Sequence, residues 1–216
     1  MSDVTLYDYF RSSAGYRVRI ALNLKRVAYD RVEISLLQGE QRRAEHLARN
    51  RQGLVPALVL SDGTVLTQSL AILDWLDGTY PEPHLFPSDP LARAQAMAQA
   101  LVIVADIHPI DNLRVLQRLE SQFGADAGAK ADWYRHWIAL GLDALEASAP
   151  TDGFFGDTAP GVVDCCLVPQ LYNARRFELD LSPWPKLVAI DARAAHLPAF
   201  AAAHPDRVAD RMAPAA

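Results

Sequence analysis

VTLYDYFRSSAGYRVRIALNLK, residues 4 to 25, is the stretch of sequence that decides the fold. Its first six residues are β-prone and aromatic, which predicts a short strand. From Tyr16 onward the apolar residues Val18, Ala21 and Leu22 recur at spacings of three and four, which predicts a helix that ends near Lys25. The strand therefore passes almost directly into the helix, and Ser12 and Ser13 stand at the junction.

The next elements complete a small mixed sheet. The sequence predicts a strand over residues 27–34, a short polar helix over 41–48, and strands over 57–60 and 64–67. The last two flank Ser61-Asp62-Gly63, and Asp-Gly between β-prone runs is a strong hairpin signal. A helix begins at Ser69. The order βαβαββα gives one parallel pair from the crossover and antiparallel strands from the hairpin.

The second half of the chain has a different pattern. Residues 81–90 contain four prolines and read as a linker, because proline cannot continue a helix. Beyond it, helical periodicity covers residues 91–123, 131–149, 161–177 and 185–203, without a convincing strand. We expect an α/β domain over residues 1–80, the linker 81–90 and an all-helical domain over 91–216, with a frayed Ala/Pro-rich tail from Ala213.

The composition excludes several classes of protein. The 216 residues carry a net charge of −5, which gives no general attraction to nucleic acid or to an anionic membrane. No run approaches the roughly 20 apolar residues of a membrane span, and no secretory signal is visible. The two cysteines, Cys165 and Cys166, are adjacent in an apolar run, which favours two buried core residues and a cytoplasmic protein over a disulfide framework.

Three short segments could carry chemistry. Ser12 and Ser13 begin a helix, where unpaired amides and the helix dipole favour an anion such as a thiolate, but serine also serves there as a plain cap. Val55-Pro56 precedes a strand, and a cis bond would expose the Val55 backbone to an extended peptide, although most X-Pro bonds are trans. Gln68-Ser69 either caps the following helix or forms a second anion-binding site.

Taken in order, these segments resemble one family. The pattern SSxxYRVRIAL from Ser12, then Val55-Pro56, then QSLAI from Gln68 is similar to the zeta class of glutathione transferases. The resemblance continues through DIHPIDNLR at residues 106–114, CLVPQ at 166–170 and RRF at 175–177, and so covers nearly the whole chain.

The resemblance implies a thioredoxin-like N-terminal domain, an all-helical glutathione-transferase C-terminal domain, a homodimer, glutathione as the cofactor and no metal. By position, Ser12 would bond the glutathione sulfur with support from Ser13, and Val55 would pair with the tripeptide before a cis Pro56. Gln68 and Ser69 would hold the γ-glutamyl end and Gln41 the glycyl end. The other positions that it assigns to cofactor binding are Ala14, Gly15, Tyr16, Arg17, His108, Asn112, Leu113 and Arg114.

The implied reaction is glutathione-dependent cis–trans isomerisation of a maleyl keto diacid, with maleylacetoacetate as the leading substrate. The substrate carboxylates and developing enolate need cationic or hydrogen-bonding partners, for which the candidates are Arg11, His108, Arg114 and Arg176. Each arginine has a plain surface role as its alternative, and His108 has a core role. Maleylpyruvate isomerisation, general conjugation of electrophiles and a non-catalytic binding module remain the alternatives.

Two positions depart from the family pattern. Many members have cysteine where this chain has Ala14, so no protein thiol accompanies the bound glutathione. The capping box of the second domain has Gly161 in place of serine or threonine. We expect that helix to form nonetheless, because glycine is a tolerable cap and Asp164 can reach back to the Gly161 amide.

Overall fold

A computed structural model describes residues 4–210, with side chains for residues 4–209. The chain divides into two compact units: one comprises the chain up to Leu85 and the C-terminal helices, and the other is Phe86–Ala194. The expected tail from Ala213 lies outside the described residues.

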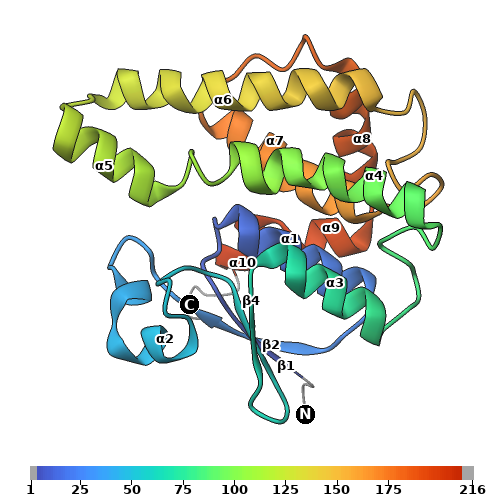
Figure 1. Ribbon diagram of the computed structural model, residues 1–216, viewed down its shortest axis with the longest axis horizontal. Helices are drawn as coiled ribbons and strands as arrows, with labels where there is room; N and C mark the ends of the chain where they lie inside the picture. The colour runs from blue at the N-terminus through green and yellow to red at the C-terminus, as the bar shows by residue number, and fades with distance from the viewer. Residues whose placement is uncertain (1–3, 211–216) are drawn as a thin grey trace. The chain divides into compact units, whose positions relative to one another are not determined.

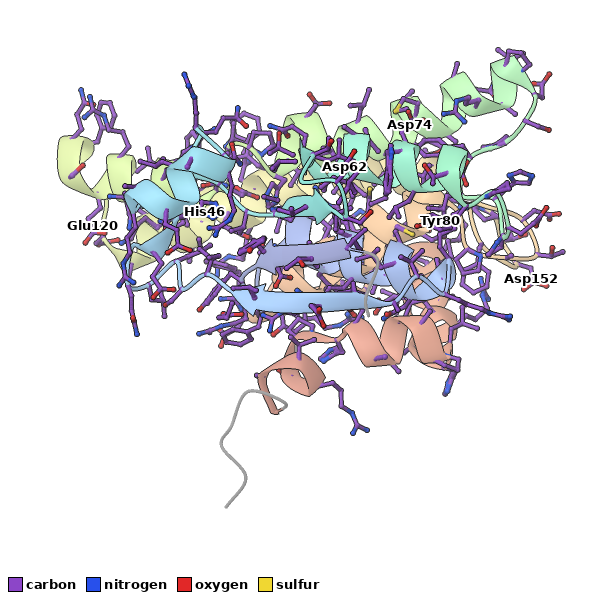
Figure 2. All side chains as sticks on the ribbon, turned by 90° about the horizontal axis from the view of Figure 1, so that it is seen from below. His46, Asp62, Asp74, Tyr80, Glu120 and Asp152 are labelled. Carbon is purple, nitrogen blue, oxygen red and sulfur yellow. The ribbon has the colours of Figure 1, made fainter. Side chains whose placement is uncertain are left out.

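The first unit contains a four-stranded sheet in the order β2-β1-β3-β4. The strands are β1 (Val4–Asp8), β2 (Tyr29–Glu33), β3 (Ala57–Leu60) and β4 (Val65–Thr67). β1 pairs in parallel with β2 and antiparallel with β3, and β3 pairs antiparallel with β4. The predicted crossover and hairpin are confirmed, and Figure 2 marks Asp62 in the hairpin turn.

The first unit also contains helical segments. They are α1 (Ser13–Leu24), the 3-10 helix η1 (Glu40–Arg42), α2 (Ala44–Arg49), α3 (Ser69–Thr79), α9 (Pro198–Ala203) and α10 (Pro205–Asp210). In Figure 1, α1 and α3 lie side by side on one face of the sheet, and α9 lies beside α1. The core between α1, α3 and the sheet is formed by aliphatic residues such as Leu6, Ile20, Leu58 and Ile72.

The second unit is helical. It contains α4 (Pro90–Leu101), the π-helical segment η2 (Val102–Ile107), α5 (Leu113–Phe123), α6 (Ala127–Ser148), α7 (Val162–Arg176) and α8 (Pro185–Ala195). α7 packs against α4, η2 and α6, and its side chains are almost all buried, including Cys165 and Cys166 as predicted. Within the described residues, no helix is long and apolar enough to cross a membrane.

The cap of α7 also forms as predicted. The Asp164 carboxylate accepts the Gly161 amide at 2.8 Å, and it also accepts the amides of Phe155 and Gly156 at 3.0 and 3.2 Å. Burial raises the pKa of Asp164 to about 6 even though these three amide bonds lower it. The carboxyl group therefore closes the loop of residues 155–161 onto the start of α7.

Two expectations need correction. The helical run over 91–123 is interrupted, because the segment around Pro109 turns and Asn112 caps a new helix, α5. The helical domain also does not extend to the C-terminus, since α9 and α10 pack with the first unit. Arg19 Nε on α1 donates to Ala203 O at 3.1 Å and Asn23 Nδ2 donates to Ala199 O at 2.9 Å, so polar bonds as well as apolar packing hold α9 there.

Candidate active site

Sheet topology brings the candidate segments of the first unit to one end of the sheet. In the strand register Tyr7 lies opposite Ala57, Ala57 lies opposite Thr67, and Asp8 is aligned with Glu33. The chain that follows β1, β2 and β4 therefore leaves from the end at which β3 begins. As a result, the segments holding Ser12, Gln41, Val55-Pro56 and Gln68-Ser69 all adjoin this end.

Ser12 occupies the N-cap position of α1. Its Oγ accepts the Gly15 amide at 3.1 Å, and its carbonyl accepts the Tyr16 amide at 2.8 Å. The capping bond uses a lone pair of the hydroxyl oxygen and leaves the hydroxyl proton available for donation. The two alternatives posed by the sequence are therefore compatible, because Ser12 can cap the helix and donate to an anion at the same time. Ser13, the first residue of α1, is buried.

Buried charges hold the loop that presents Ser12. The Phe10 carbonyl accepts from Arg19 Nη2 at 2.9 Å, and the Phe10 amide donates to Glu33 Oε1 at 3.3 Å. Arg19 is also paired with Asp8, and both side chains are fully buried. Burial raises the pKa of Glu33, which the nearby Arg31 guanidinium lowers in part. The Phe10 backbone, two residues before Ser12, is therefore held at both its amide and its carbonyl.

The Val55–Pro56 bond is cis, as the family resemblance implied. The carbonyl of the preceding residue, Leu54, accepts two hydrogen bonds from α2 and its C-terminal end. His46 Nε2 and Asn50 Nδ2 each donate to it at 2.9 Å. His46, labelled in Figure 2, is buried on α2. These two donors fix the loop from which Val55 presents its backbone.

The glutamines and Ser69 lie around the same loop. Gln68 Nε2 donates to Gln52 Oε1 at 2.9 Å, and a Cβ added to Gly53 would approach the Gln41 carbonyl to 3.2 Å. Gln68 has a φ of 67°, in the left-handed region, and its side chain does not cap α3. At Ser69, Oγ accepts a hydrogen bond from Arg17 Nη1 at 3.2 Å.

Polar atoms without internal partners suit this end of the sheet to a peptide ligand. Gln41 Oε1 is buried and accepts no hydrogen bond, and the first amides of α3 donate none to the Gln68 side chain. The Ser12 hydroxyl proton is a further donor. An extended, charged tripeptide with its own amides and carboxylates fits such a donor and acceptor set. Within residues 4–209, no group of His, Cys, Asp and Glu side chains could hold a metal ion.

The other predicted residues of the first unit are mostly buried around α1. Ala14, Gly15 and Tyr16 are buried. The Tyr16 ring packs edge-on against the His204 ring, with 6.1 Å between the ring centres. Gly15 allows a close approach, because a Cβ there would lie 2.6 Å from Asp8 Oδ2. Arg11 Nη2 donates to the Tyr9 hydroxyl at 3.4 Å, and its guanidinium lies 4.9 Å from the centre of the Phe10 ring.

In the second unit, the predicted residues 108–114 occupy the break between η2 and α5. The His108 amide donates to Ile103 O at 2.9 Å, which closes the π-helical segment. Asn112 caps α5 by accepting the Arg114 amide at 3.1 Å, and Leu113 is the first residue of that helix. The Arg114 side chain is exposed. π-Helical segments are frequent at functional sites, which makes this break a reasonable place for ligand-binding residues.

The two arginines at the end of α7 have different partners. Arg175 pairs with Asp191 of α8 at 2.7 Å. Arg176 Nη1 donates to Asn173 Oδ1 at 3.3 Å, and its guanidinium lies 5.9 Å from the centre of the Phe177 ring. Arg175 is thus part of a salt bridge within the unit, whereas Arg176 donates to an uncharged amide.

Several residues that shape these segments were not predicted from the sequence. His46 lies on the short helix α2 and Asn50 is its C-cap, a spacing of four that could have indicated joint action. Arg19 and Glu33 carry no sequence signal of their own, because their role depends on contacts with Phe10. Asp111 is buried, and both of its carboxylate oxygens are without a hydrogen-bond partner.

Comparison with known proteins identifies the family. Residues 6–84 match the glutathione S-transferase N-terminal domain family. The chain is 48% identical over 217 residues to a protein of Vibrio cholerae named "Probable maleylacetoacetate isomerase", covering 97% of this chain and 99% of the relative.

Solved structures agree over nearly the whole chain. A maleylpyruvate isomerase described as a bacterial zeta-class glutathione S-transferase superposes with a TM-score of 0.91 at 42% identity, covering 94% of this chain and 97% of that one. The maleylacetoacetate isomerase of Anaeromyxobacter dehalogenans, solved with dicarboxyethyl glutathione and citrate in the active site, gives a TM-score of 0.83 at 42% identity, covering 98% of this chain and 97% of that one. The chain therefore belongs to the zeta class of the glutathione transferases.

Proposed function

We propose that this protein is a glutathione-dependent cis–trans isomerase of a maleyl keto diacid, with maleylacetoacetate as its substrate. The observation that carries the proposal is the Ser12 hydroxyl, which caps α1 while keeping its proton for an anion. The near full-length relative of Vibrio cholerae supports the choice of substrate.

The chain's own contribution is to hold an ionised sulfur. When bound, glutathione supplies a thiolate that adds reversibly to the maleyl double bond, so that the bond can rotate from cis to trans before the thiolate is expelled. Ser12 donates its hydroxyl proton to that sulfur, and the first amides of α1 add partial positive charge. Lowering a thiol pKa by about two units requires about 2.7 kcal/mol of preference for the thiolate, which these interactions can provide.

The remaining cofactor contacts follow the positions of the family. In this proposal Ser13 supports Ser12, the Val55 backbone pairs with the cysteinyl part of glutathione, and Gln41 contacts the glycyl end. Gln68 and Ser69 hold the γ-glutamyl end. The unpaired Gln41 oxygen and the uncapped start of α3 support these assignments.

Cationic and hydrogen-bonding side chains are proposed to hold the diacid. Arg11, His108, Arg114 and Arg176 are the candidates, and Asn112 and Leu113 belong with His108 and Arg114 to the cofactor positions. The neutral partner of Arg176 supports its choice over Arg175, whose charge is already paired with Asp191. The adduct named in the Anaeromyxobacter structure carries two carboxylates, as a maleyl substrate does.

Maleylpyruvate isomerisation is the second candidate. It uses the same chemistry on a shorter acid, and the similarity to a solved maleylpyruvate isomerase supports it. Both substrates have a conjugated maleyl group, so an ultraviolet assay can compare them directly.

The assay uses the purified protein with each substrate, with and without glutathione. We expect turnover only with glutathione, and a higher kcat/KM for maleylacetoacetate. Ser12→Ala should lower kcat about 100-fold while weakening glutathione binding much less, because the bond to sulfur matters most when the thiolate forms. Ser61→Ala, an exposed serine of the hairpin turn, is the matched control and should be fully active.

Three results would contradict the proposal. Turnover without glutathione would exclude the thiolate route, and full activity of Ser12→Ala would remove the role of Ser12. Conjugation of halogenated aromatics at a much higher kcat/KM than either maleyl acid would identify a general transferase instead.

We also propose that the protein is a cytoplasmic homodimer, as the family pattern implies. Light scattering of the purified protein should give twice the mass of the 216-residue chain at micromolar concentration. A monomer at that concentration would contradict the proposed assembly without affecting the assignment of the reaction.

A further inference from the structure

Arg17 is a buried cation that contacts Ser69, a residue of the proposed binding site for the γ-glutamyl end of glutathione. It lies on α1 with only 1% of its surface exposed, and its Nη1 donates to Ser69 Oγ at 3.2 Å. Ser69 is the first residue of α3, and 4% of its surface is exposed. A side chain this deeply buried acts on a bound ligand through Ser69.

This contact determines the direction of the Ser69 hydroxyl. A guanidinium can only donate, so Ser69 Oγ must be the acceptor and its single proton must point elsewhere. Among the described residues, Ser69 Oγ makes no other hydrogen bond. The hydroxyl proton is therefore a buried donor that lacks an acceptor, at a helix start whose amides are uncapped.

We propose that Arg17 is a positioning residue that makes Ser69 select the α-carboxylate of the γ-glutamyl end of glutathione. The inference rests on the proposed function, because it requires glutathione at this end of the sheet. Arg17 orients the Ser69 hydroxyl toward the ligand and polarises it. Its positive charge then lies on the far side of Ser69 from the ligand carboxylate. Hydrogen bonds to charged groups are stronger than neutral ones, and a buried charge is screened little by solvent.

Its neighbour Arg19 shows the contrast on the same helix. Arg19 is equally buried, but its guanidinium is paired with Asp8 and bonded to the carbonyls of Phe10 and Ala203. Arg19 therefore holds chain segments together, whereas Arg17 Nη1 donates to a hydroxyl whose own proton has no acceptor within the described residues.

The test measures binding by calorimetry for two ligands. One is glutathione, and the other is 4-aminobutyryl-cysteinylglycine, which is glutathione without the α-carboxylate. We expect the unmodified protein to prefer glutathione by tenfold or more, and Arg17→Met to remove most of that preference. Ser69→Ala should remove it to a similar extent, and the double variant should lose little more, because Arg17 acts on the ligand through Ser69.

Arg49→Met is the matched control. It removes a guanidinium from α2 that lies over the Tyr7 ring and pairs with Glu45, and it should leave the ratio of the two affinities unchanged. If Arg17→Met weakens both ligands by the same factor, the role of Arg17 is only structural and the inference is wrong. If the unmodified protein binds neither ligand at millimolar concentration, the proposed function itself fails.

Two further measurements cover the case in which Arg17→Met does not fold. Arg17→Gln also removes the charge but keeps a polar group, and it is judged by the same ratio. The unmodified protein should keep its preference for glutathione in 0.5 M sodium chloride, because Arg17 is buried. Loss of the preference in salt would assign carboxylate recognition to an exposed cation and overturn the inference.

Discussion

Asp111 lies in the break between η2 and α5, with its carboxylate buried and both oxygens without a hydrogen-bond partner. Burial raises the pKa of Asp111 to about 8. Its neighbours in sequence, His108 and Asn112, belong to the proposed ligand-binding segment. At neutral pH this residue is therefore a largely neutral carboxylic acid inside the second unit.

The raised pKa predicts a pH-dependent stability. Between the ordinary pKa of 3.8 and about 8, the folded protein keeps a proton on Asp111 that the unfolded chain releases. The free energy of unfolding thus falls as the pH rises through this window, by up to about 1.4 kcal/mol per unit. Asp111→Asn should be more stable than the unmodified protein at pH 8 by about 2 kcal/mol or more, with a smaller difference at pH 5.

Urea unfolding at pH 5 and pH 8 measures this difference. Asp106→Asn, which changes an exposed carboxylate five residues earlier, is the control and should follow the unmodified protein at both pH values. Parallel pH curves for the Asp111→Asn variant and the unmodified protein would show that Asp111 is ionised in the folded state.

At the scale of elements, the packing of α6 against η2 depends on a single glycine. A Cβ added to Gly141 of α6 would lie 2.2 Å from Ile107 Cδ1 and 2.6 Å from Ile107 Cγ1. Ile107 is the last residue of the π-helical segment and precedes His108. The absence of a side chain at position 141 therefore decides where the segment with His108 can lie.

Gly141→Ala should force η2 away from α6 at a cost of about 1–3 kcal/mol in the free energy of unfolding. Gly78→Ala is the matched control, because a Cβ at Gly78 of α3 meets no atom within 4 Å and alanine favours the helix. Thermal unfolding should show a lower Tm for Gly141→Ala and an unchanged or higher Tm for Gly78→Ala. Equal Tm values for the two variants would contradict the packing argument.

At the scale of the whole molecule, the C-terminal helices complete the unit that the N-terminus begins. α9 packs on α1, and it supplies the carbonyls that accept from Arg19 and Asn23. Since α1 also carries Ser12, the end of the chain stabilises the element on which the proposed chemistry depends. Lys25 acts similarly within this unit, because its Nζ donates to Asp77 Oδ1 and to the Pro83 carbonyl at 2.6 Å each.

A chain that ends at Ala195 should lose part of this stability. Removing α9 leaves a buried Arg19 donor without its acceptor, which costs about 1–3 kcal/mol, and exposes the apolar face of α1 as well. Hydrogen exchange should show faster exchange of the α1 amides. Asn23→Ala, which removes one bond to α9, should give a smaller effect of about 1 kcal/mol, and unchanged exchange in the truncated chain would contradict the role of α9.

The order of elements was largely predictable from the sequence, because each element has a local signal. The βαβ crossover, the Asp-Gly hairpin and the cap by Asp164 rest on residues close together in the chain, and all three form. The interruption of the 91–123 helix was missed although Pro109 and the N-cap Asn112 are local signals of a helix break. The packing of α9 on α1 was missed because it joins residues about 180 positions apart, for which no local pattern exists.

The candidate site divides in the same way. The sequence by itself determined the family motif and the chemical groups available: the serines before α1, Val55-Pro56 and Gln68-Ser69. Only the tertiary structure decided which groups are held and which are left for a ligand, as with Arg17 behind Ser69 and the unpaired carboxylate of Asp111. The physical reason is that propensity and capping act within a few residues, whereas burial, hydrogen-bond partners and pKa depend on what the folded chain brings together.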